Sequence, residues 1–116
     1  MLACRFALKH IRHRYQENCK SKGAQILVSP AAWEPGVHDP NGEWGRSTLD
    51  TGLPLFVCNR TGQDDALDFT DAESVVAQAG KRLASFRSKR STAFVFDWNK
   101  TTQSIASGDV RKIALT

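Results

Sequence analysis

Two short apolar segments, each ended by small and polar residues, constrain the fold of this chain more than any other feature. Residues 24–29 and residues 53–59 are dominated by Leu, Val, Ile, Ala and Phe, and the interval between them has room for one short helix. A continuous apolar run of this length is typical of a strand that is covered on both faces. The pattern therefore predicts a strand–helix–strand unit in a domain of mixed α/β class.

The remaining patterns predict a helix at the start of the chain and paired strands towards its end. Apolar residues spaced by three and four, from Cys4 to Cys19, place one stripe on a helix over residues 5–22, and Gly23 ends that helix. Gly52 ends a second helix over residues 44–51.

The predicted strands complete a mixed, partly antiparallel sheet. Pro30 ends the first strand because proline cannot donate a ladder hydrogen bond. A Gly80-Lys81 turn joins two strands as a hairpin. After Asn99 the pattern fades into a C-terminal tail or arm, residues 99–116. The expected strands are residues 24–29, 53–59, 74–78, 82–86 and 92–98.

Charge is divided into blocks. The net charge is +4, and basic residues dominate residues 1–22 and 81–116, whereas acidic residues dominate residues 23–80. No aromatic residues interleave with the basic clusters, as a surface that stacks nucleic-acid bases would need. We therefore predict solvated basic faces and no nucleic-acid partner. The rival interpretation, a basic nucleic-acid-binding domain, predicts binding that weakens steeply with salt.

The cysteine pattern indicates a reduced, cytoplasmic environment. Cys4, Cys19 and Cys58 have no framework spacing, and their odd number argues against a disulfide scaffold. Cys19 and Cys58 lie in apolar patterns and are expected to be buried packing residues. No apolar run approaches the length of a membrane span, and residues 1–6 do not form a secretory signal.

The sequence predicts no metal site and no membrane partner. His10 and His13 are the only pair close enough on a helix face to share a metal, and their spacing with the cysteines is wrong for a zinc finger. The acidic loop at residues 64–71 lacks the alternating acids and glycine of a calcium loop. We expect these side chains to be solvated.

Five segments in this order resemble the C-terminal half of a carbon–nitrogen hydrolase of the nitrilase superfamily: residues 23–33, 42–51, 54–62, 74–83 and 93–98. The resemblance implies an α/β fold that is part of a nitrilase-like α-β-β-α sandwich. It covers residues 23–98 well and residues 1–22 poorly. It divides the chain into a partial hydrolase domain, residues 1–98, and the tail or arm.

The resemblance also implies a chemistry. Members of this family hydrolyse amide, carbamoyl or nitrile C–N bonds without a cofactor, using a glutamate base, a lysine and a cysteine nucleophile in that order. Cys4 is the candidate nucleophile, because a helix beginning near Arg5 would favour its thiolate. Arg5 and Phe6 depart from the small or acidic residues that usually follow the cysteine. The glutamate and lysine have no counterpart, since only Met1–Ala3 precede Cys4.

Trp33 and Glu34 are the candidate substrate-binding residues. They follow the end of the first predicted strand, where α/β proteins place their binding sites. The alternative for Glu34 is a solvated loop acid. Trp98 shares a strand face with Phe94 and Phe96, which predicts a place in the core or between sheets.

The sequence thus predicts a truncated carbon–nitrogen hydrolase that is inactive alone, because the base and the lysine are missing. Full-length relatives would act on a small amide or nitrile. Half of a sandwich leaves one face of its sheet uncovered, and a homodimer is one way to cover it. The alternative function, favoured by the same missing residues, is a non-catalytic binding or scaffolding module of this fold.

Overall fold

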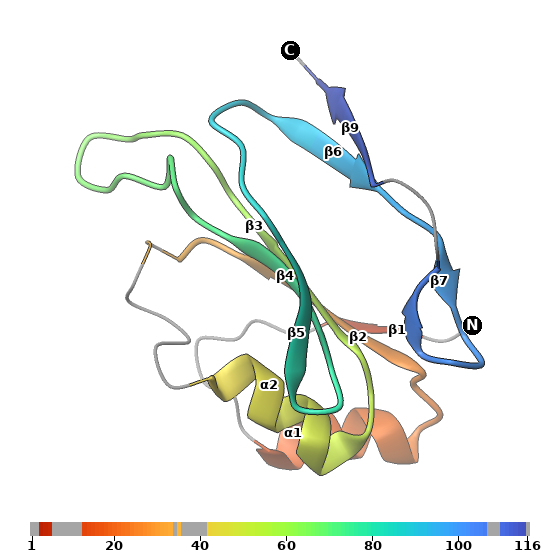
Figure 1. Ribbon diagram of the computed structural model, residues 1–116. Helices are drawn as coiled ribbons and strands as arrows, with labels where there is room; N and C mark the ends of the chain where they lie inside the picture. Colours follow the sequence, from red (N-terminus) through yellow and green to blue (C-terminus); the bar gives the residue numbers. More distant parts are fainter. Residues whose placement is uncertain (1–2, 6–12, 34, 36–41, 107–109, 116) are drawn as a thin grey trace.

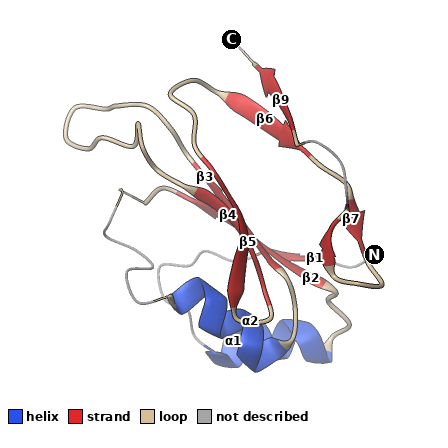
Figure 2. Cartoon of the chain, in the orientation of Figure 1, coloured by secondary structure: helices blue, strands red, loops and turns tan. Residues whose placement is uncertain are grey.

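A five-stranded sheet organises the chain, with two helices on one face and a pair of small hairpin-like ladders on the other (Figures 1 and 2). This computed structural model describes residues 3–5, 13–33, 35, 42–106 and 110–115. The sheet has the strand order β1-β2-β3-β4-β5. Its elements in chain order are β1 (Ala3–Arg5), α1 (His13–Ser21), β2 (Ile26–Ala31), α2 (Glu43–Thr51), β3 (Leu55–Asn59), β4 (Ser74–Gln78) and β5 (Lys81–Phe86).

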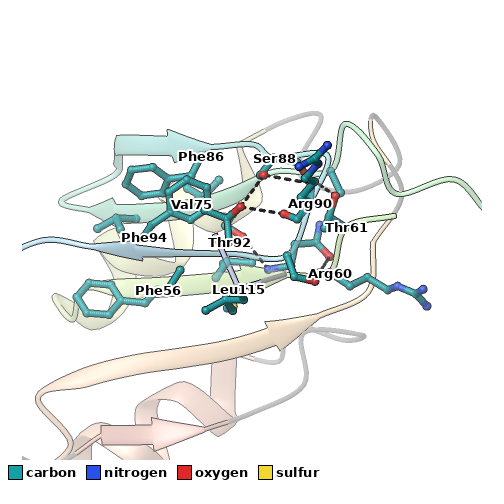
Figure 3. A pocket seen from close by; sticks show the side chains of 18 of the residues that line it. Phe56, Arg60, Thr61, Val75, Phe86, Ser88, Arg90, Thr92, Phe94 and Leu115 are labelled. Atoms are coloured by element: carbon teal, nitrogen blue, oxygen red, sulfur yellow. Dashed lines mark hydrogen bonds between the residues drawn. The ribbon is translucent and has the colours of Figure 1, made fainter. Parts of the chain in front are cut away.

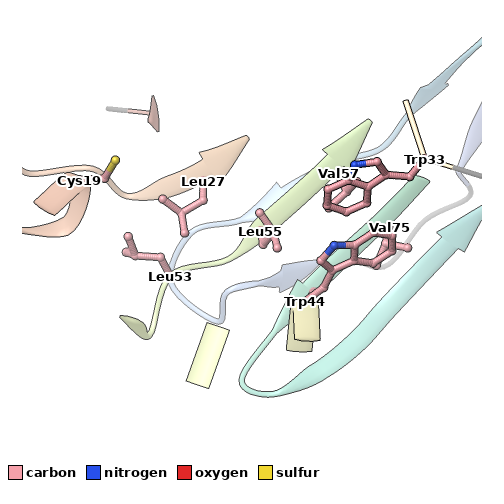
Figure 4. Packing of buried hydrophobic residues seen from close by; sticks show 9 residues of the cluster. Cys19, Leu27, Trp33, Trp44, Leu53, Leu55, Val57 and Val75 are labelled. Carbon is pink, nitrogen blue, oxygen red and sulfur yellow. The ribbon is translucent and has the colours of Figure 1, made fainter. Parts of the chain in front are cut away.

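The sheet is mixed, as the sequence predicts. β1, β2 and β3 are mutually parallel, whereas β3, β4 and β5 form antiparallel pairs. Side chains alternate between the two faces of a strand, so Leu27 on β2 and Leu55 and Val57 on β3 all point towards the helices and are buried. With Val75 of β4 and Trp44 of α2 they form the hydrophobic core between sheet and helices (Figure 4).

The prediction that Pro30 ends the first strand is wrong, because β2 continues to Ala31. The Leu27 N–H donates to the Pro54 carbonyl, on the β3 side of the strand. Successive residues of a strand point their backbone groups to opposite sides, so the nitrogen of Pro30 faces β1. The pairing of β1 with β2 runs only as far as Val28. The missing N–H of Pro30 therefore falls where no ladder hydrogen bond is required.

The first helix is described from His13 to Ser21, and the strand β1 occupies Ala3–Arg5. The prediction of a helix beginning near Arg5 is therefore wrong at Arg5, and residues 6–12 lie outside the described part of the chain. The helix ends as predicted. The Gly23 N–H donates to the Lys20 carbonyl at 2.9 Å, and Gly23 takes a φ of 93° that favours glycine.

The second helix packs closely on the β4–β5 hairpin. A Cβ on Gly45 would lie 2.8 Å from the carbonyl oxygen of Gly80, so only glycine allows this approach. The Gly80 N–H donates to the Thr48 hydroxyl at 2.9 Å and ties the hairpin to α2. Gly52 ends the helix as predicted, with its N–H on the Thr48 carbonyl.

The β4–β5 hairpin is confirmed, with its turn one residue earlier than predicted. Ala79 and Gly80 both have positive φ, 52° and 78°. Positive φ at both central residues is the mark of a type I′ turn, whose twist matches that of the flanking strands.

Residues 92–106 and 110–115, here called the arm, fold back over the sheet face that lies opposite the helices (Figure 1). The predicted strand at residues 92–98 is divided into β6 (Thr92–Val95) and β7 (Trp98–Asn99). Two further strands lie where the sequence pattern fades. β8 (Ser104–Ile105) pairs with β7, and β9 (Arg111–Ala114) pairs with β6.

Aromatic contacts attach the arm to the sheet. The ring of Phe56 on β3 meets Phe96 at 6.0 Å and Trp98 at 5.2 Å between centroids, both edge to face. Phe86 on β5 stacks on Phe94 at 4.8 Å. Such pairs add to the gain from burial itself. Of the helices in the described residues, none combines the length and the apolar composition that crossing a membrane requires.

Candidate functional site

The carboxyl ends of β2 and β3 meet at one edge of the sheet, because the two strands are parallel. Trp33 follows the last residue of β2, and Asn59 is the last residue of β3. Ligands of α/β sheets commonly bind at such an edge. This edge therefore contains the first group of side chains to consider.

The side chain of Asn59 joins the segment after β2 to the end of β3. Its Oδ1 accepts hydrogen bonds from the Trp33 N–H at 2.9 Å and from the Arg60 N–H at 3.1 Å. Its Nδ2 donates to the Trp33 carbonyl at 3.0 Å. The Asn59 N–H in turn donates to the Ser74 hydroxyl at 2.9 Å. One amide thus pairs with both backbone groups of Trp33, beyond the end of the strand ladder.

The indole of Trp33 is buried against the second helix. It stacks on Trp44 with centroids 5.3 Å apart and ring planes 11° apart (Figure 4). The guanidinium of Arg82 lies 5.3 Å from the centroid of Trp44. Trp33 is only 9% exposed and lines neither the cavity beside Phe56 and Phe86 nor the smaller one beside Pro54 and Trp98. Glu34, the second predicted substrate-binding residue, lies outside the described residues.

Glu73 binds two arginines beside this edge. Its carboxylate accepts hydrogen bonds from Arg82 and from Arg87. Burial acts to raise the pKa of Glu73, but the hydrogen bonds from Arg87 and Arg82 and their positive charges outweigh it and hold the pKa below its usual value. The carboxylate therefore stays ionised and positions Arg82, the residue next to Trp44.

The acidic loop makes turns. Asp64 accepts hydrogen bonds from the Leu67 N–H at 3.0 Å and from Arg60 at 3.2 Å. The hydroxyl and the backbone N–H of Thr70 both donate to Asp68 and hold its pKa below the usual value. Such side-chain to backbone bonds are typical of Asx turns. His10 lies outside the described residues, and within the part that is described no three His, Cys, Asp or Glu side chains gather as metal ligands would.

The fold of this chain was compared with those of known proteins. Neither the protein-family models nor the sequences of curated proteins include a match to the chain. Solved structures do match. One is a mutant of the amidase of Nesterenkonia AN1, from the nitrilase superfamily, with 22% sequence identity and a TM-score of 0.63. A second mutant of the Nesterenkonia sp. AN1 amidase, with 22% identity and a TM-score of 0.64, carries the acetamide moiety of fluoroacetamide on its active-site cysteine.

The chain has a nitrilase-like fold.

The match covers 73% of this chain and 33% of the amidase, so the chain spans about a third of the length of these relatives. A third structure, a mutant amidase in complex with butyramide, matches over the same shares with 20% identity and a TM-score of 0.59. The expected architecture, part of a nitrilase-like α/β sandwich with a mixed sheet, is thus confirmed. This similarity shows the fold alone. Any catalytic chemistry depends on which side chains this chain places at the site.

Cys4, the predicted nucleophile, lies within β1 of the nitrilase-like sheet, one residue before that strand ends. Its backbone is level with Leu27, near the start of β2. Trp33 lies beyond Ala31, and the four residue steps from Leu27 to Ala31 span roughly 13 Å at the usual rise of a strand. The structure therefore does not bring Cys4 to the same level of the sheet as Trp33.

Two residues of this nitrilase-like fold have roles that the sequence reasoning missed. Cys58 is exposed and free, which contradicts the predicted burial, because it points to the face away from the helices while Val57 points towards them. The alternation along β3 is the signal that could have revealed it. The sequence pattern marks Asn59 only as the last residue of the predicted strand at residues 53–59. Its hydrogen bonds to Trp33 join residues 26 positions apart, and no local sequence pattern predicts them. Cys19 is buried in the core, as predicted, but it is disulfide-bonded, contrary to the expectation of reduced cysteines.

Proposed function

We propose that these 116 residues form the nucleophile-side and C-terminal portion of a carbon–nitrogen hydrolase, with Cys4 at the position of the nucleophile. On their own they do not turn over an amide or a nitrile. The observation that carries this proposal is the likeness of the sheet and its helices to nitrilase-superfamily amidases over about a third of their length.

The chemistry expected of the whole enzyme explains what these residues lack. The cysteine sulfur attacks the amide carbon while a base accepts the thiol proton. The C–N bond then breaks, ammonia leaves, and water hydrolyses the thioester to release the acid and restore the thiol. The sequence before Cys4 holds neither a glutamate for the proton nor a lysine for the developing charge. Each such group contributes a factor of about 10² or more to the rate.

The placement of the candidate residues agrees with an incomplete site. The indole of Trp33 is covered by Trp44, and the backbone of Cys4 is level with Leu27 rather than with Trp33. A pocket that requires both a nucleophile and a substrate-binding wall is therefore not assembled from the described residues alone.

Amide hydrolysis combined with cysteine mapping tests the proposal. The reduced, desalted chain and its Cys4→Ala variant are incubated with butyramide, and released ammonia is measured. Alkylation of each cysteine by iodoacetamide is followed across pH by peptide mass spectrometry, with the exposed Cys58 as internal reference. We expect no turnover above that of Cys4→Ala. Turnover that the substitution abolishes would overturn the proposal, because it requires a base within these residues.

A non-catalytic binding module of the same fold is the second candidate. The Trp33–Trp44 stack favours it, because Trp33 packs on a helix and does not form the wall of a catalytic pocket. Titration of ¹⁵N-labelled protein with butyramide separates the two candidates. A binding module that keeps the family's ligand class gives saturable shifts at Trp33 and Asn59, whereas a partial enzyme gives none.

We also propose that the chain self-associates to cover exposed apolar surface. Leu83 on the edge strand β5 and Ile113 on β9 are 41% and 46% exposed. Unpaired strand edges favour pairing with another chain. Light scattering after size-exclusion chromatography tests this proposal, and a monomer at high micromolar concentration would contradict it.

A further inference from the structure

A cavity of about 560 Å³ lies between the arm and the sheet face opposite the helices (Figure 3). Its floor comes from β3, β4 and β5, and its wall comes from β6 and the residues around it. This volume is in the range of sites that hold small organic molecules. The cavity reaches the end of β3, because Asn59 lines it, but Trp33 does not.

The body of the cavity is aromatic. Phe56 and Phe86 belong to the sheet and Phe94 to the arm (Figure 3). Phe96 of the arm also lines the cavity. Phe86 stacks on both arm rings, with centroids 4.8 Å from Phe94 and 6.0 Å from Phe96. Rings held in offset or edge-to-face geometry provide a surface that suits another aromatic or alkyl group.

A chain of hydroxyl groups holds one end of the cavity in shape. The Thr61 hydroxyl, at the end of β3, donates to the Ser88 carbonyl. The hydroxyls of Ser88 and Thr92 lie 2.8 Å apart, and Thr92 also donates to the Arg90 carbonyl at 2.9 Å. These bonds attach the start of the arm to the sheet (Figure 3). The cavity is therefore formed before any ligand binds, which lowers the entropic cost of binding.

The charged side chains at the Thr61–Thr92 end of the cavity are all positive. The described residues that line it include Arg60 and Arg90 but no aspartate or glutamate. Arg60 is already engaged, because it pairs with Asp64 at 3.2 Å and lies 4.5 Å from the Phe69 ring centroid. Arg90 has no ion pair among the described residues. It supplies a cation at the rim that an anionic ligand group could meet.

We propose that this cavity binds a small molecule with an aromatic or alkyl body and a single anionic group, such as an aryl carboxylate. The body lies against the apolar surface that the four phenylalanines form, and the anion lies at the Arg90 end. This binding function goes beyond the proposed hydrolase chemistry and does not depend on Cys4. Cys58 also lines the cavity and is free, so it reports on occupancy.

Three probes of matched shape test the proposal on the full 116-residue chain: 4-phenylbutyrate, 4-phenylbutanol and 4-phenylbutylamine. Calorimetry gives each dissociation constant, and mass spectrometry gives the rate at which iodoacetamide modifies Cys58. We expect the carboxylate to bind about fivefold or more tightly than the alcohol, as a charge-assisted hydrogen bond at a partly exposed rim allows. The amine should bind most weakly, and bound carboxylate should slow the modification of Cys58.

Two variants and one change of salt concentration distinguish recognition of the carboxylate by Arg90 from non-specific hydrophobic binding. Arg90→Gln should reduce the affinity for phenylbutyrate to that of the alcohol. Lys89→Gln removes a neighbouring charge that does not line the cavity, and should leave all three affinities unchanged. Should Arg90→Gln fail to fold, raising the salt concentration on the unaltered protein replaces it, because screening should reduce the advantage of the carboxylate alone.

Three results would overturn the proposal. One is the absence of binding by phenylbutyrate at millimolar concentration. A second is equal affinity for the carboxylate and the alcohol, which would mean that Arg90 recognises nothing. A third is protection of Cys58 that grows with protein concentration when no probe is present, because a second copy of the chain would then occupy this face.

Discussion

Replacement of Asn59 by alanine tests whether one amide holds the edge of the sheet together. The side chain makes three hydrogen bonds to backbone groups, of 2.9, 3.1 and 3.0 Å, in a partly buried setting. A net value of about 1 kcal/mol for each bond, reduced for partial exposure, gives a loss of about 2–3 kcal/mol for Asn59→Ala. That is a large fraction of the roughly 5–15 kcal/mol that stabilises a typical domain.

Urea unfolding followed by tryptophan fluorescence measures the loss, and near-ultraviolet circular dichroism reports on the Trp33–Trp44 stack. Asn99→Ala is the matched control. Its side chain also accepts two backbone hydrogen bonds, from Thr101 at 2.9 Å and Thr102 at 3.0 Å, but in an exposed turn of the arm. We expect a loss below about 1 kcal/mol there.

A third substitution identifies which of the bonds matter. Asn59→Asp keeps an acceptor for the N–H groups of Trp33 and Arg60 but cannot donate to the Trp33 carbonyl. Its loss should lie between those of Asn59→Ala and the unaltered protein. The reasoning is refuted if Asn59→Ala unfolds within about 0.5 kcal/mol of the unaltered protein, or if Asn99→Ala is equally destabilised.

Further predictions concern packing, turn geometry and pH. Gly45→Ala should destabilise the chain by about 1–2 kcal/mol in urea unfolding, because the new Cβ would meet the Gly80 carbonyl at 2.8 Å; a gain would contradict this packing. Ala79→Asn should raise the stability by about 0.5 kcal/mol, since asparagine tolerates the positive φ of a type I′ turn better than alanine; no change or a loss counts against the turn type. Gln16→Met should stabilise by about 1 kcal/mol, because neither polar atom of the buried Gln16 side chain has a hydrogen-bond partner among the described residues; a clear loss would show that they have one. Folding lowers the pKa of Glu73, so its contribution to the free energy of unfolding is present above the unfolded pKa near 4.5 and is lost as the pH falls below that value. Glu73→Gln should flatten this acidic part of the curve of stability against pH. An unchanged curve in this range would refute the assignment.

Much of the architecture could be predicted from local pattern. The apolar runs at residues 24–29 and 53–59 identified β2 and β3, and glycine at positions 23, 52 and 80 marked two helix ends and a hairpin turn. These features depend on neighbouring residues, because side-chain alternation and positive φ are properties of a few consecutive positions. Pro30 shows the limit, since its tolerance depends on where β1 stops pairing with β2.

The candidate site was predictable only in part for the same reason. Trp33 was expected at the end of a strand, and it is there, but its indole is covered by Trp44, which only the packing of α2 on the sheet decides. The order of elements from α1 to β5, the class of the sheet and the likeness to a nitrilase-type half follow from the sequence by itself. The tertiary structure alone decided that Asn59 holds the backbone of Trp33, that Cys58 faces an aromatic cavity, and that residues 92–106 and 110–115 fold back to form its wall. Each of these depends on contacts between residues far apart in the chain, and such contacts leave no periodic signal along it.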